Sequence, residues 1–67
     1  MEVGLRIAKK MKEMGITAAA VCRKTGIAPG RLYPSLIGKR ELRADEFLAI
    51  CHELNLDPWE MAGKFGA

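Results

Sequence analysis

Within residues 17–40, Gly26 separates two stretches that each have the composition of a short helix, and this arrangement restricts the fold most. Thr17 suits the start of the first stretch, because its hydroxyl oxygen can accept hydrogen bonds from free backbone N–H groups. Gly26 is the residue type that ends a helix at positive φ. Pro29 fits the first turn of a second helix. Helix, glycine turn and helix at these distances are typical of a helix-turn-helix motif.

The second of these helices, expected over residues 28–37, contains an internal proline. Pro34 removes a hydrogen bond to the Gly30 carbonyl and disfavours helical backbone angles at Tyr33. We therefore expect a helix that is kinked or loosened near Pro34. The alternative is a helix that begins only at Pro34.

Apolar periodicity and capping residues predict four further helices, over residues 2–14, 17–25, 44–54 and 58–65. The last has the clearest start signal, with Asp57 as N-cap, Pro58 in the first position and Glu60 placed as in a capping box. Leu56 and Met61 fit a hydrophobic staple across this start. The sequence thus predicts one all-α domain of five helices spanning residues 1–67, without strands.

The expected core is aliphatic, because only 6% of the 67 residues are aromatic. We expect both cysteine thiols to be buried and reduced, since two cysteines without CxxC spacing make no disulfide scaffold. The predicted core residues are Ile7, Met11, Ile16, Val21, Cys22, Ile27, Leu32, Ile37, Phe47, Leu48, Ile50, Cys51, Leu54 and Leu56.

Charge divides the chain into two unlike parts. Residues 1–40 hold nine Lys/Arg against two Glu, a net charge of +7, whereas residues 41–67 hold two Lys/Arg against six Asp/Glu, a net charge of −4. A basic part that coincides with a helix-turn-helix pattern suggests a face for a polyanion. Ordinary solvated charge on small helices is the alternative.

The spacing of residues 15–40 resembles the helix-turn-helix of the phage repressor and Cro family, also called the XRE family, without a gap. Residues 44–62 also resemble the last two helices of that family. The matching residues are Gly15-Ile16-Thr17, Val21-Cys22, Gly26-Ile27, Leu32 and Gly38-Lys39-Arg40.

The resemblance implies a five-helix repressor-like fold and a DNA-binding transcriptional regulator that needs no cofactor. In the family the second helix of the motif, here about 28–37, lies in the major groove of duplex DNA. The residues that correspond to DNA contacts, or that lie beside them, are Thr17, Arg23, Lys24, Ala28, Pro29, Gly30, Arg31, Tyr33, Lys39 and Arg40. Lys39 and Arg40 are expected to grip the DNA backbone, helped by Arg23 or Lys24.

Two departures from the family pattern bear on DNA recognition. Ala18 stands where many members carry a Gln that binds a DNA phosphate, and Ala20 stands where a Glu often completes a capping box. At the tip of the second helix, Ala28, Pro29 and Gly30 carry no hydrogen-bonding side-chain groups. Direct reading of bases by Arg31 and Tyr33 should therefore be sparse, and we expect sequence preference to depend on contacts of Ala28 with thymine methyl groups or on DNA shape.

Family members commonly bind DNA as twofold dimers, and the resemblance therefore implies a homodimer at least on DNA. Trp59 falls in the first turn of the last helix, where an exposed aromatic would be a good interface anchor. Packing of Trp59 over its own core is the alternative. His52 is expected to be a bystander exposed on helix 44–54.

Nothing in the sequence supports an enzyme, a metal site or a membrane protein. There is one histidine and no His/Cys cluster with the spacing of metal ligands. No apolar run approaches the roughly 20 residues that span a membrane, and a cytoplasmic location is expected. The rival function is a protein-interaction module on the same fold, such as an antitoxin or an anti-repressor that binds a protein partner.

Overall fold

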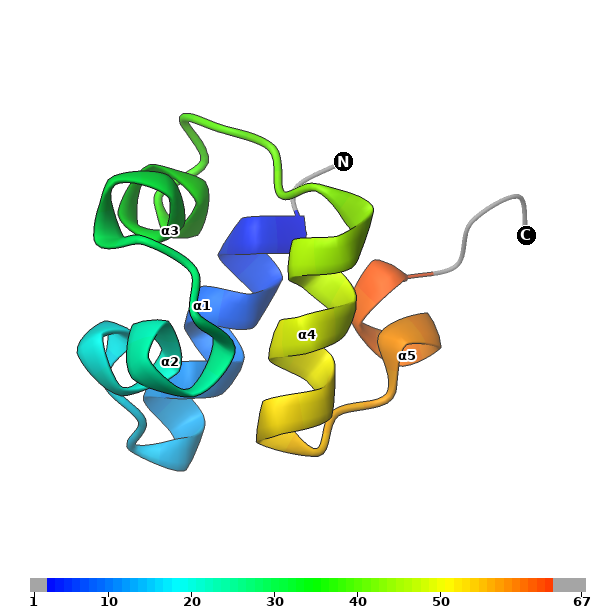
Figure 1. Ribbon diagram of the computed structural model, residues 1–67. Coiled ribbons are helices and arrows are strands. Elements are labelled where there is room, and N and C mark those ends of the chain that lie inside the picture. Colours follow the sequence, from blue (N-terminus) through cyan, green and yellow to red (C-terminus); the bar gives the residue numbers. More distant parts are fainter. Residues whose placement is uncertain (1–2, 64–67) are drawn as a thin grey trace.

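Figure 1 shows the computed structural model of the protein, which describes residues 3–63. Within this range the chain forms only helices: α1 (Val3–Met14), α2 (Ala18–Thr25), α3 (Pro29–Leu36), α4 (Ala44–Leu54) and α5 (Pro58–Ala62). The predicted all-α class, the five helices and the bounds of α4 are confirmed, and the other starts agree to within one residue.

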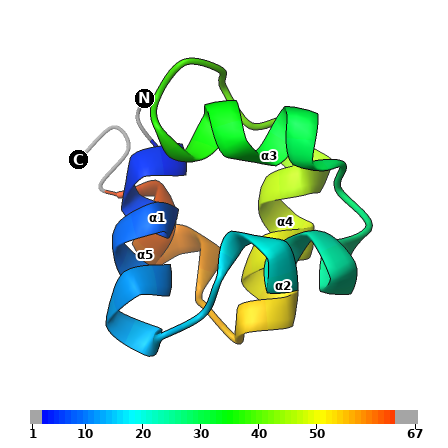
Figure 2. The same ribbon diagram turned by 90° about the vertical axis from the view of Figure 1, so that its left-hand side faces the viewer.

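The helices pack so that α2 and α3 form one side of the molecule. Helix α1 contacts α3 and α5, α2 contacts α3 and α4, and α4 also contacts α5. In Figure 1, α2 and α3 occupy the left side and α5 the right. Figure 2 turns the left side to the viewer, and α2 and α3 then run across the front in opposite directions. The predicted helix-turn-helix therefore lies on an outer face.

The start and end of α2 follow the sequence prediction. Thr17 is the N-cap in extended conformation, and its Oγ1 accepts a hydrogen bond of 3.1 Å from the Ala20 N–H. Gly26 ends the helix at φ 80°, and its N–H donates to the Cys22 carbonyl at 2.9 Å. This left-handed conformation is readily reached by glycine, so Gly26 sets the direction in which the chain leaves α2.

Helix α3 continues through Pro34, so the alternative in which it begins at that proline is wrong. Pro34 leaves the Gly30 carbonyl without its helical partner, but Gly30 is exposed and water can replace that bond. The helix closes at Gly38, whose φ is 82°, with the Lys39 N–H donating to the Pro34 carbonyl at 2.9 Å. At this helix end Pro34 contributes only its carbonyl oxygen as an acceptor, and its missing N–H is not needed. The short helix therefore accommodates the proline.

Helix α5 is shorter than predicted. It ends at Ala62, and Gly63 follows at φ 85° and ψ −168°. The prediction of a helix to residue 65 is therefore wrong at Gly63, and residues 64–65 lie outside the described part. Asp57 is the N-cap as predicted, with the Trp59 N–H donating to its Oδ1 at 2.9 Å. In the described part, Asp57 accepts from the second N–H of the helix and not the third, and Glu60 makes no reciprocal bond, so the predicted capping box is wrong and Asp57 acts as a simple N-cap.

The core lies between the helices and is aliphatic, as expected. Met61 of α5 joins it, although the sequence analysis gave this residue only to the staple. The buried apolar residues are Ile7, Met11, Val21, Ile27, Leu32, Ile50, Cys51, Leu54 and Met61, and the half-buried ones packed on them are Val3, Ile16, Ala18, Cys22, Leu36, Leu42, Phe47 and Leu56.

Two residues predicted for the core are exposed. Ile37 is 62% exposed and Leu48 is 53% exposed. Each residue turns a helix by roughly 100°, so Ile37 lies about 140° around from buried Leu32, and Leu48 about 200° around from buried Ile50. The prediction that Ile37 and Leu48 are buried was therefore wrong, because it rested on their apolar character and not on their angular positions.

The two thiols differ in their surroundings, which corrects the prediction that both are buried. Cys51 is 1% exposed, and burial raises the pKa of its thiol, with a smaller contribution from the charge of Asp57. Cys22 is only half-buried at the edge of the core. Bulky thiol reagents should therefore reach Cys22 before Cys51.

Candidate nucleic-acid interface

The outer side of α2, α3 and the following loop collects most of the predicted site residues. Arg40 is half-buried, whereas the other predicted contact residues are exposed: Thr17, Arg23, Lys24, Ala28, Pro29, Gly30, Arg31, Tyr33 and Lys39. Arg23 and Lys24 lie in the last turn of α2, close in sequence to the start of α3. Exposed cations thus stand before and after the start of α3, where residues 28–30 carry no charge.

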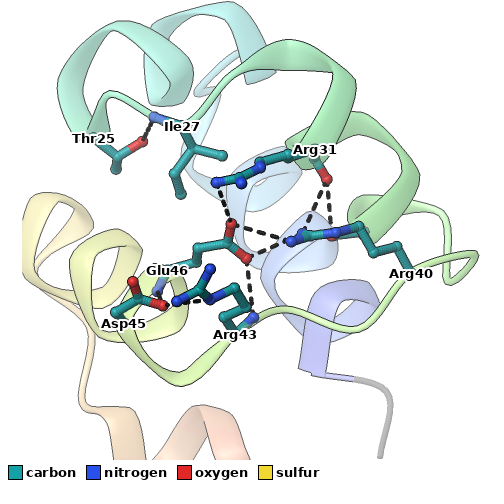
Figure 3. Close-up of polar contacts among 8 residues, drawn as sticks. Thr25, Ile27, Arg31, Arg40, Arg43, Asp45 and Glu46 are labelled. Atoms are coloured by element: carbon teal, nitrogen blue, oxygen red, sulfur yellow. Dashed lines mark hydrogen bonds and ion pairs between the residues drawn. The ribbon is translucent and has the colours of Figure 1, made fainter.

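The turn between α2 and α3 is fixed by a residue that the sequence analysis did not assign. The Thr25 hydroxyl donates to the Val21 carbonyl at 2.7 Å and accepts from the Ile27 N–H at 3.2 Å. Figure 3 shows the second of these contacts. Ile27 is itself 8% exposed and anchors the turn in the core. A threonine directly before the turn glycine was the available signal, because Thr commonly bonds neighbouring backbone groups at helix ends.

A buried carboxylate lies behind α3 and was also missed. Glu46, at the start of α4, is 5% exposed. Arg40 binds it through two hydrogen bonds, from Nη1 to Oε1 at 3.0 Å and from Nη2 to Oε2 at 3.2 Å (Figure 3). The backbone N–H of Arg43 donates to the same Oε1 at 2.9 Å. The carboxylate therefore joins the loop after α3 to the start of α4.

The hydrogen bond from Arg40 holds the pKa of Glu46 below its ordinary value. The Arg43 N–H and the charges of Arg40 and Arg31 act in the same direction, and desolvation of the buried carboxylate opposes them. Glu46 therefore remains ionised at neutral pH. The sequence signal was a Glu in the third position of a helix whose N-cap, Arg43, has no side-chain acceptor of its own.

Arg40 also connects to α3 through a buried serine. Its Nη1 donates to the Ser35 Oγ at 3.0 Å, and that hydroxyl donates to the Arg31 carbonyl at 2.9 Å. Ser35 is 0% exposed, and the Arg40 side chain is 28% exposed. The guanidinium expected to grip the DNA backbone is thus occupied by Glu46 and Ser35, which gives Arg40 a structural role.

Arg31 has a looser position than Arg40. Its Nη1 lies 3.7 Å from Glu46 Oε2, while its side chain is 58% exposed. This separation makes an ion pair, but it exceeds hydrogen-bond distance. The Arg31 side chain is thus exposed near the start of α3, and the charge of the buried Glu46 carboxylate attracts it toward the protein (Figure 3).

An apolar hollow lies on the same side of the molecule. It measures about 270 Å³ and is lined by Ala18, Tyr33, Leu36 and Ile37. Tyr33 and Ile37 are 46% and 62% exposed. The first residue of α2, the second half of α3 and the residue after it therefore present carbon surface on this side of the molecule.

Trp59 lies away from this surface, in the first turn of α5. Its side chain is 78% exposed, so the alternative in which it packs over its own core is wrong. His52 on α4 is exposed, as expected. Among residues 3–63, no group of three His, Cys, Asp or Glu side chains is arranged to hold a metal ion. No helix in the same range has the length and apolar character needed to span a membrane.

A family model described as a Cro/C1-type HTH DNA-binding domain matches residues 6–62 of the chain. The match covers the helix-turn-helix of α2 and α3 and also α4 and α5. No curated protein and no solved structure matches the chain at a significant level.

Proposed function

The chain belongs to the Cro/C1-type helix-turn-helix DNA-binding domain family, and we propose that it is a transcriptional regulator of the phage repressor or Cro type that places α3 in the major groove of duplex DNA. The observation that carries this proposal is the exposed start of α3 between exposed cations on α2 and in the loop after α3. An α-helix fits the width of the B-DNA major groove, and flanking Lys and Arg side chains suit the phosphates on its two sides.

In this proposal the exposed cations contact different parts of the DNA. Lys39 follows the end of α3 and contacts the DNA backbone, as do Arg23 and Lys24 from the last turn of α2. Arg31 and Tyr33 reach base edges or the flanking phosphates. Thr17 accepts the capping bond of α2 through its hydroxyl oxygen and is exposed beside α3, which keeps it in the proposed interface.

Base reading in this proposal is mainly apolar. The exposed residues Ala28, Tyr33 and Ile37 present carbon atoms to the groove, and in the major groove the C5-methyl group of thymine is the apolar feature of the bases. The hollow lined by Ala18, Tyr33, Leu36 and Ile37 supports the thymine-methyl contacts expected from the sequence and extends them along α3.

The proposed assembly is a homodimer on DNA, in which two copies bind two half-sites. The supporting observation is Trp59, a large aromatic side chain that is 78% exposed on α5. Helix α5 and the recognition helix lie on different sides of the molecule in Figure 1, so pairing through α5 would leave α3 free for DNA.

The rival function is a protein-interaction module such as an antitoxin or anti-repressor, and the same apolar hollow favours it. Exposed Tyr33 and Ile37 would suit an apolar side chain of a protein partner as well as a methyl group. The family match favours DNA, and so do the exposed cations at the end of α2 and after α3, because they suit the phosphates of a duplex.

Mapping backbone amide shifts by NMR during titration with a 20-base-pair duplex tests the proposal. Shifts concentrated in residues 28–33 and at Lys39, with small changes along α1, are the expected result. Shifts confined to α5, or no shifts at low salt, would remove the DNA-binding role and leave the protein-partner function.

A further inference from the structure

Two arginine side chains, those of Arg40 and Arg31, lie near the buried carboxylate of Glu46, but only Arg40 is hydrogen-bonded to it. Arg40 engages both of its oxygens, and the Arg43 N–H adds a third hydrogen bond on Oε1. Arg31 is a third group at the carboxylate, with its Nη1 3.7 Å from Oε2 and no hydrogen bond to it. The carboxylate is thus satisfied without Arg31, yet its charge still acts on that side chain.

The two arginines differ in how easily they can leave Glu46. The Arg40 side chain is 28% exposed and also bonds Ser35, whereas the Arg31 side chain is 58% exposed. Solvent screens the exposed pair much more than the buried one. Arg31 is therefore the guanidinium that can exchange partners while Arg40 keeps the loop and α4 together.

We propose that Glu46 is a positioning residue that retains the Arg31 guanidinium on the protein, so that Arg31 engages DNA only where a site offers it a better acceptor than the carboxylate. This inference rests on the proposed DNA-binding function. A guanine edge or a well-placed phosphate provides two acceptors for the planar guanidinium, whereas Glu46 offers Arg31 only a distant, already occupied oxygen. On poorly matched DNA, Arg31 stays near Glu46 and releases fewer counterions.

The effect expected is a lower affinity for non-specific DNA than the number of exposed cations suggests. Each cation that neutralises a phosphate adds to the salt dependence of binding. If Glu46 retains Arg31, that side chain adds little to the salt dependence of binding to random sequence. On a matched site it adds as much as any other cation that neutralises a phosphate. Glu46 would thereby widen the difference between the two affinities without touching DNA itself.

The first test compares Glu46→Gln with Glu53→Gln on a mixed-sequence 20-base-pair duplex over a range of salt. Both variants lose one negative charge, but Glu53 is exposed at the other end of α4. Glu46→Gln should bind this duplex about 3- to 10-fold more tightly than Glu53→Gln, and its salt slope should be steeper by up to about 1. The gain should vanish when Arg31→Gln is also present.

Equal affinities for the two single variants, or a gain that survives Arg31→Gln, would overturn the proposal. A purely structural role of Glu46 predicts weaker binding instead of a steeper slope. No binding of any duplex by the wild type would remove the DNA-binding function together with this inference. Binding without a Glu46 effect would remove the inference alone.

A second test avoids any loss of folding that Glu46→Gln causes by releasing Arg40. Arg31→Gln in the otherwise unchanged protein is titrated with the mixed duplex and with a duplex selected from a random pool by the wild type. The salt slope should fall by about 1 on the selected duplex and by much less on the mixed one. Equal losses on both would show that Glu46 does not retain Arg31.

Discussion

Gly4 of α1 lies so close to Ser35 of α3 that a Cβ atom at Gly4 would overlap the Ser35 carbonyl oxygen. Ser35 is fully buried at this crossing, and its hydroxyl is the atom through which Arg40 reaches α3. The approach of two backbones thus connects the packing of α1 to the position of α3.

Gly4→Ala should destabilise the domain for this reason. Alanine favours helix over glycine by up to about 1 kcal/mol, but overpacking against a backbone atom typically costs about 1–3 kcal/mol. The net loss should appear as a lower urea midpoint with an unchanged slope. Gly30→Ala is the matched control, because a Cβ there meets nothing within 4 Å, and it should leave stability unchanged or slightly raised. A higher urea midpoint for Gly4→Ala than for the wild type would contradict this prediction, because it would mean that α1 and α3 move apart at little cost.

Acid should weaken the domain through Glu46. Its pKa in the folded protein is lowered from 4.5, chiefly by the hydrogen bond from Arg40. A lowered pKa contributes stability that is fully present above the unfolded-state value and is lost as pH falls through the folded-state value. Urea unfolding at a series of pH values should therefore show a loss below 4.5 that is smaller in Glu46→Gln. Parallel pH profiles for the two proteins would assign the acid loss to other carboxylates.

Thymine methyl groups should contribute to binding if the apolar side of α3 reads the major groove. Replacing thymine by deoxyuridine throughout a selected duplex removes those methyl groups and leaves the hydrogen-bonding groups in place. The affinity of the wild type should fall, and Ile37→Ser should remove most of the difference between the two duplexes. Equal affinities of the wild type for both duplexes would leave shape as the basis of any sequence preference.

Self-association should depend on Trp59. Truncating a large exposed aromatic at an interface centre commonly costs 2 kcal/mol or more, roughly a 30-fold weaker dimer. Sedimentation at micromolar to high micromolar concentration, with and without duplex, compares wild type with Trp59→Ala. A monomer under every condition for both proteins excludes the proposed dimer.

Local rules accounted for most of the fold. Thr17, Gly26 and Asp57 each start or end a helix as expected, because capping depends on the residue and its immediate neighbours. The end of α4 follows the same rule. Asn55 takes the left-handed conformation at φ 59°. The exposure of Ile37 could not be predicted from such local rules. It depends on where α3 ends, at Leu36, and on how far the helix has rotated by that residue.

The site was less predictable than the fold. The exposure of Arg31 and Tyr33 follows from their positions around α3, and that of Lys39 from its place in the loop after α3, but the partner of Arg40 does not follow from any such position. Glu46 meets Arg40 and Ser35 only because α3 and α4 are held near each other, a tertiary contact that leaves no periodic signal in the sequence. The same holds for Gly4, whose role depends on a neighbour 31 positions away in the chain.

The salt dependence of duplex affinity for Lys39→Ala against Lys9→Ala tests the central claim most directly. Both residues are exposed lysines, but Lys39 follows α3 whereas Lys9 lies on α1 beside Glu60 of α5. If α3 and its following loop form the DNA surface, Lys39→Ala should lower the salt slope by about 1 and weaken binding to all sequences alike. Lys9→Ala should leave the slope unchanged. Equal slopes for the two variants, or wild-type protein that binds no duplex at low salt, would contradict the account.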